Sequence, residues 1–134
     1  MGFVTTTTAA LVGTISGVVC YFAVSLKNRL KWDDALDVWG VHGVGGVLGT
    51  ILLGVFASKA VNPAGADGLL AGNGSFLMKQ TVAVLGASAW AFVFTYGMLI
   101  VIDKVTPVKV SEAEEADLDK SLHGEDAYDL GHAI

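Results

Sequence analysis

The chain has 134 residues, of which 53% are hydrophobic and only 16% charged, and its mean hydropathy is +0.61. Soluble domains usually carry about 25% charged residues, so this composition excludes an ordinary soluble domain and indicates a membrane protein. The net charge of −5, without clustered Lys and Arg, excludes a nucleic-acid-binding surface. A single cysteine, Cys20, excludes a disulfide within the chain.

Three apolar segments are long enough to cross a bilayer as helices, which takes about 20 residues each. We therefore expect an all-α membrane protein with transmembrane helices over about 5–26, 34–58 and 77–105, inside a transmembrane region at 1–106. Residues 107–134 are predicted to form a second part, an acidic tail.

The acidic tail carries eight of the thirteen acidic residues of the chain. Pro107 disfavours helical geometry in the residue before it and so predicts the end of the third helix. Ser111 followed by Glu114 has the spacing of a capping box, which predicts a short helix in the tail. The tail histidines His123 and His132 lack the spacing of a metal site, so we expect no metal and no cofactor.

Basic residues indicate the orientation of the chain in the membrane. The loop after the first span contains Lys27, Arg29 and Lys31, and Lys104 and Lys109 follow the third span. Loops rich in Lys and Arg usually remain in the cytoplasm. We therefore expect a multi-pass protein of the plasma or inner membrane, in contact with lipid, whose C-terminus is cytoplasmic.

The second span contains one ionisable side chain, that of His42. An ionisable group in a membrane helix is costly, and it usually has a function. On a regular helix, His42 shares one face with Val38 and with the small residues Gly45, Gly46 and Gly49. This face is expected to line a pore, with the alternative that His42 only hydrogen-bonds a neighbouring helix.

Three carboxylates precede this histidine, Asp33, Asp34 and Asp37, and the last two are three residues apart. This spacing predicts a carboxylate version of the capping box at the start of the second helix, where the helix dipole also favours acids. The alternative is that they guide cations at the inner mouth of a pore.

The same stretch resembles a motif of the ammonium transporters, the Amt/Mep/Rh family. Residues 33–43 match the pattern D-D-x-x-D-x-x-x-x-H-G. The tail resembles that of bacterial and archaeal members of the family. The matching tail segments are Ser111-Glu112, Leu118-Asp119, His123-Gly124-Glu125 and Ala127-Tyr128.

The resemblance implies a fold of about eleven spanning helices, of which this chain supplies the last three and the tail. It also implies that further N-terminal helices of the same transporter are partners of this chain, and that the protein is a homotrimer. Each subunit would contain a hydrophobic pore for ammonium or ammonia. His42 matches the second of two pore histidines, and Val38 matches a position on the pore wall.

The resemblance also implies a regulatory tail, which packs on the cytoplasmic face and in some members binds a nitrogen-signalling PII protein. The tail residues that match are Leu118, Asp119, His123, Gly124 and Tyr128. One position departs from the family pattern, because Asp117 stands where glycine is usual. Glycine accepts backbone angles that aspartate resists, so the geometry of this tail is expected to differ.

We therefore expect ammonium transport, with this chain as the C-terminal portion of the transporter. Two alternatives remain at this point: a truncated fragment that transports nothing, and a small membrane sensor or assembly subunit whose tail binds a partner. An enzyme is not expected, because the sequence offers no nucleophile–base set and no H-E-x-x-H pair.

Overall fold

The structure is a computed structural model, and it describes residues 2–111 together with Glu114, Lys120 and Gly124. Its contacts divide the chain into two compact units, Met1–Ala89 and Trp90–Ile134. All regular secondary structure in the described residues is helical, which confirms the predicted all-α class.

Three long helices carry the fold. Helix α1 spans Thr6–Leu30, and the π-helical turn η1 at Trp39–Gly43 runs directly into α2 at Val44–Phe56. After a loop with one 3₁₀ turn, η2 at Leu69–Ala71, helix α3 spans Gly74–Asp103. Helices α1 and α3, and η1 with α2 as one continuous segment, are long and apolar enough to cross a membrane.

Helix α1 continues four residues past the expected end of its apolar segment. Lys27 and Arg29 lie in its last turn, where the negative end of the helix dipole favours cations. The helix ends at Lys31, which adopts a left-handed conformation with φ 53°. At the other end, the Thr5 hydroxyl caps the helix by accepting a hydrogen bond from the Thr8 N–H at 3.2 Å.

The second spanning helix begins at Trp39, whereas the sequence suggested a start near residue 34. Asp37 explains the difference, because its φ of 54° lies in the left-handed region and interrupts a right-handed helix. Residues 32–37 therefore form a turn between the two helices.

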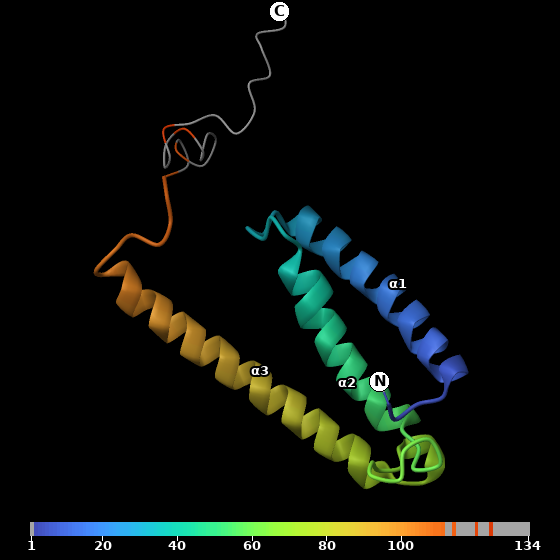
Figure 1. Cartoon of the computed structure of the whole chain (residues 1–134). Helices are drawn as coiled ribbons and strands as arrows, with labels where there is room; N and C mark the ends of the chain where they lie inside the picture. Colours follow the sequence, from blue (N-terminus) through green and yellow to red (C-terminus); the bar gives the residue numbers. More distant parts are fainter. Residues whose placement is uncertain (1, 112–113, 115–119, 121–123, 125–134) are drawn as a thin grey trace, which may run out of the picture. The chain divides into compact units, whose positions relative to one another are not determined.

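Helices α1 and α2 run side by side in opposite directions (Figure 1). Glycines permit their close approach. A Cβ added at Gly40 would lie 2.7 Å from Val24 Cγ2 and 3.1 Å from the Val24 backbone nitrogen, and one at Gly45 would lie 3.2 Å from Cys20 Sγ. Small residues allow such backbone contacts between helices in lipid, where the hydrophobic effect does not drive helices together.

The loop after α2 packs against the N-terminal segment of the chain. The Ser58 N–H donates to the Phe3 carbonyl oxygen at 3.0 Å, and the Phe3 ring lies so close to Gly65 that a Cβ there would clash at 2.5 Å. A Cβ at Gly68 would lie 2.6 Å from the Val55 carbonyl oxygen. These contacts hold the start of the chain against the end of α2.

Helix α3 contributes to both units. In the first unit, a Cβ at Gly54 of α2 would lie 3.1 Å from the Leu77 Cα atom, so the two backbones meet closely. In the second unit, exposed aromatic rings stack at helical spacing, with 5.8 Å between the ring centroids of Trp90 and Phe94. Exposed apolar rings of this kind suit a helix that contacts lipid or other helices.

The close approach at Gly40 yields a test of the packing. We expect Gly40→Ala to destabilise the protein by about 1–3 kcal/mol, because the added methyl group meets the backbone of Val24. The matched control is Gly46→Ala, since nothing lies within 4 Å of a Cβ at that position. Thermal unfolding of the full-length protein in detergent measures both effects, and equal losses in the two variants would contradict the described packing.

Candidate functional site

His42 lies in the π-helical turn η1. The turn is closed by the Val44 N–H, which donates to the Trp39 carbonyl oxygen five residues earlier. Single π-helical turns inside α-helices occur often at functional sites, because they insert one residue into the helical register. The His42 side chain is exposed in the structure of this chain.

The turn is packed against α1 on one side. Gly40 is buried against Val24, and Gly45 lies beside Cys20. The Cys20 thiol also approaches the Val41 carbonyl oxygen at 3.9 Å. Successive turns of α1 thus contact successive positions of the segment that carries His42.

These contacts determine which way His42 faces. His42 follows Gly40 by two residues, which is about half a turn in a π-helical turn as in an α-helix. Gly40 is buried against α1 whereas His42 is exposed, which favours an imidazole that leaves the helix on the side away from α1. Val38, the other predicted pore residue, is also exposed.

Lys27 links α1 to the turn that precedes η1. Its side chain is only 8% exposed. The Lys27 ammonium donates to the Asp34 carbonyl oxygen at 2.6 Å, and it lies 2.6 Å from Asp37 Oδ1 in an ion pair. The Asp37 Oδ1 atom is itself buried. Among the described residues it accepts no hydrogen bond of acceptable geometry, and its contact is the ion pair with Lys27.

Sequence reasoning missed this role of Lys27. In the prediction from sequence, Lys27 was only one of several basic residues that indicate the orientation of the chain in the membrane. The signal available was the presence of a lysine one helical turn before the end of α1, followed within ten residues by three aspartates. The spacing does not reveal which of the neighbouring basic residues is buried, and Arg29 and Lys31 are exposed.

Asp34 caps the helix that carries His42. Its two carboxylate oxygens accept hydrogen bonds from the Val38 and Trp39 N–H groups, each at 2.9 Å. The hydrogen bond from Trp39, helped by that from Val38 and by the charge of Lys27, lowers the pKa of the Asp34 carboxyl below its ordinary value, although partial desolvation opposes the shift. The carboxylate therefore remains ionised at neutral pH.

Asp37 does not complete the expected capping box with Asp34. Its N–H donates to the Asp34 carbonyl oxygen at 3.3 Å, while its carboxylate pairs with Lys27. The physical reason is the buried ammonium group of Lys27, which needs a negatively charged partner more than the Asp34 N–H needs an acceptor. The two aspartates thus have different partners in the structure.

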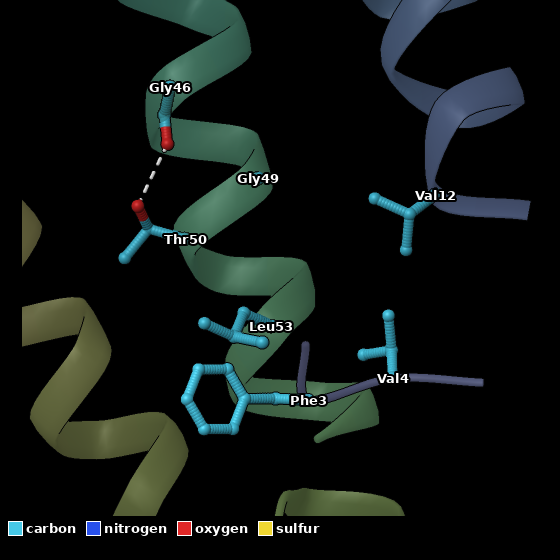
Figure 2. Close-up of a pocket in the computed structure, with 7 residues that line it drawn as sticks. All are labelled: Phe3, Val4, Val12, Gly46, Gly49, Thr50 and Leu53. Atoms are coloured by element: carbon cyan, nitrogen blue, oxygen red, sulfur yellow. Dashed lines mark hydrogen bonds between the residues drawn. The ribbon is translucent and has the colours of Figure 1, made fainter. Parts of the chain in front are cut away.

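The predicted small residues of α2 lie in different surroundings. Gly45 faces α1, whereas Gly46 and Gly49 line an apolar pocket of about 370 Å³ (Figure 2). The Thr50 hydroxyl donates to the Gly46 carbonyl oxygen at 2.9 Å at the edge of this pocket. The remaining lining residues are Phe3, Val4, Val12 and Leu53. His42 is not among the residues that line this pocket, so the structure does not bring the three glycines and His42 to one common surface.

The tail begins with the predicted capping box. The Ser111 N–H and hydroxyl donate to Glu114 Oε2 at 2.9 and 2.7 Å, and the Glu114 N–H donates back to the Ser111 hydroxyl oxygen at 3.4 Å. These bonds from Ser111 lower the pKa of the Glu114 carboxyl, and they confirm the capping box.

Most residues of the predicted regulatory tail are not among those that the structure describes. Leu118, Asp119, His123 and Tyr128 lie outside the described residues. Gly124 is described, and its φ of 71° lies in the region that favours glycine. Within the part of the chain that the structure describes, no three His, Cys, Asp or Glu side chains come together as a metal site.

The capping role of Asp34 predicts a specific pH dependence. A carboxyl whose pKa is lowered on folding stabilises the protein above its unfolded pKa, near 3.8, and loses that effect as the pH falls through the folded pKa. We therefore expect Asp34→Asn to lower the thermal unfolding midpoint at neutral pH, and the gap from wild type to close as the pH falls from the unfolded pKa through the lower folded pKa.

The difference between wild type and Asp34→Asn cancels the other titrating groups, so midpoints measured in detergent across this pH range test the cap directly. A gap that is absent at neutral pH, or that widens on acidification, would contradict it.

Comparison with known proteins places the chain in a family. Residues 1–128 match the model of the Ammonium Transporter Family. An ammonium transporter of Bacillus subtilis is 43% identical over 129 residues, which cover 95% of this chain and 32% of that protein. Ammonium transporter Amt1 of Archaeoglobus fulgidus is 39% identical over 128 residues, with the same coverage.

Solved structures agree with this match. The crystal structure of Saccharomyces cerevisiae Mep2 superposes with a TM-score of 0.76 at 31% identity, covering 84% of this chain and 27% of that one. The chain spans about a third of the length of the curated relatives that it matches. Since the family match extends over nearly all of its residues and its three long helices are apolar, the chain is part of a multi-pass membrane protein and belongs to the ammonium transporter family.

Proposed function

We propose that the protein containing this chain transports ammonium across the cell membrane, and that His42 lines its pore. The observation that carries the proposal is the placement of His42. It is the single ionisable side chain of the η1–α2 span, and it is exposed, whereas Gly40, two residues earlier, is buried against α1. The names of the relatives, which are ammonium transporters, support the same substrate.

The chemistry of an imidazole suits this role. Moving ammonium as a hydrated cation into an apolar channel is costly, because the channel cannot replace its water. Release of a proton at the entrance leaves ammonia, which is neutral and passes more easily. A neutral imidazole offers one hydrogen-bond donor and one acceptor, so His42 can orient ammonia or pass on a proton.

The surroundings of His42 support a narrow path rather than a wide one. The η1–α2 helix is apolar around the imidazole, and Val38, one turn earlier, presents an apolar side chain on the exposed surface. We propose that Val38 and His42 contribute one wall of the pore, and that helices from the remainder of the transporter contribute the others.

We further propose a homotrimer with a cytoplasmic C-terminus. The excess of basic residues next to the loop 31–38 and after α3 supports this orientation. In this orientation Leu118, Asp119, His123, Gly124 and Tyr128 belong to a regulatory tail at the cytoplasmic face, which a PII protein would reach. Transport, rather than catalysis of a chemical reaction, is the proposed activity.

Replacement of His42 tests the proposed function. We expect His42→Ala in the full-length transporter to lower ammonium uptake about tenfold, because losing one hydrogen bond to the substrate costs about 1.4 kcal/mol. Uptake of ammonium and of methylammonium, measured per folded protein in a strain without other ammonium transporters, gives both the rate and the selectivity.

The matched control is Thr14→Val, which removes from α1 a hydroxyl group that, among the described residues, donates to the Ala10 carbonyl oxygen of its own helix. It should leave uptake unchanged. Undiminished and equally selective uptake in His42→Ala would refute the role proposed for the histidine.

A further inference from the structure

We propose that Lys27 is a positioning residue for His42. By holding the turn at residues 34–37 against α1, it fixes the direction in which the imidazole leaves its helix. This inference rests on the proposed function of His42, and it adds a residue that lies outside the pore wall and acts through the backbone.

The burial of Lys27 is the first observation. Lysine is almost never fully buried unless it is paired. The residue Lys27 is only 6% exposed, whereas the basic residues Arg29 and Lys31, in the same region, are exposed. A buried ammonium group must recover the hydration that it loses, and Lys27 does so with two oxygens of the following turn, each at 2.6 Å.

The second observation is the backbone of Asp37. Its φ of 54° is unfavourable for a residue with a side chain, and such a conformation persists only where the surroundings hold it. The ion pair between its carboxylate and Lys27 is a contact that does so. The bond from the Lys27 ammonium to the Asp34 carbonyl oxygen attaches the other end of the same turn.

The third observation connects this turn to His42. The Asp37 carbonyl oxygen accepts a hydrogen bond from the Val41 N–H at 2.9 Å, so the orientation of Asp37 sets the first helical bond before the histidine. Val24, which contacts Gly40, lies three residues before Lys27 and hence on the same face of α1. The segment just before His42 is therefore attached to one face of α1 at two levels.

Loss of the ammonium group would release one of these two attachments. It would also leave the buried Asp37 oxygen without its cationic partner, which favours a rearranged turn. A helix that starts differently presents His42 at a different angle. Because productive geometry is sensitive to displacements of about 1 Å, a small rotation is enough to impair transport.

The test uses Lys27→Met in the full-length transporter, with Arg29→Met as the matched control that removes an exposed positive charge from the same helical turn. Uptake and the ammonium-to-methylammonium ratio are measured per folded protein, alone and in the His42→Ala background. We expect Lys27→Met to lower uptake about tenfold and to change the ratio, with no further change in the His42→Ala background. Arg29→Met should match wild type, and Lys27→Arg should restore much of the activity.

If Lys27→Met yields no folded protein, Lys27→Met with Asp37→Asn removes the unpaired charge, and the same altered ratio is expected. Unchanged uptake and ratio per folded protein in these variants would overturn the inference, as would losses that add fully to those of His42→Ala. If His42→Ala impairs transport and Lys27→Met does not, only this inference fails. If His42→Ala itself has no effect, the proposed function fails and the role of Lys27 falls with it.

Discussion

The buried ammonium group of Lys27 sets the geometry from which the His42 helix begins. A charge taken out of water needs compensating oxygens. The chain after α1 must therefore turn back so that the Asp34 carbonyl and the Asp37 carboxylate reach Lys27. That turn leaves the Asp34 carboxylate free to cap the N–H groups of Val38 and Trp39.

Glycines then decide how closely the second helix follows the first. At Gly40 the backbones of two helices meet with no room for a methyl group, and the loop at Gly68 meets the end of α2 in the same way. At Gly46 and Gly49 the same residue type leaves open space and lines a pocket. Glycines of the same helical segment thus permit close packing at one position and line a pocket at another. The position of the neighbouring element determines which of the two a glycine does.

The spans were predictable because the free energy of placing a helix in lipid depends on the length and composition of a segment, not on its partners. The residues at which the helices begin and end were less predictable. The second helix begins at Trp39 rather than near residue 34, because Asp37 adopts a left-handed conformation beside a lysine contributed by another helix. No local pattern around Asp37 shows this, since aspartate in the first turn of a helix ordinarily favours helix formation.

The sequence by itself determined that this chain has three apolar helices, one ionisable group inside the second of them, and the motif that leads to the family. Only the tertiary structure decided which basic residue is buried, which glycines face α1, and on which side His42 projects. The reason is that a face is defined by helical register, and the π-helical turn at residues 39–43 adds a residue to the register that regular spacing assumes. Contacts with α1 fix where that extra residue goes.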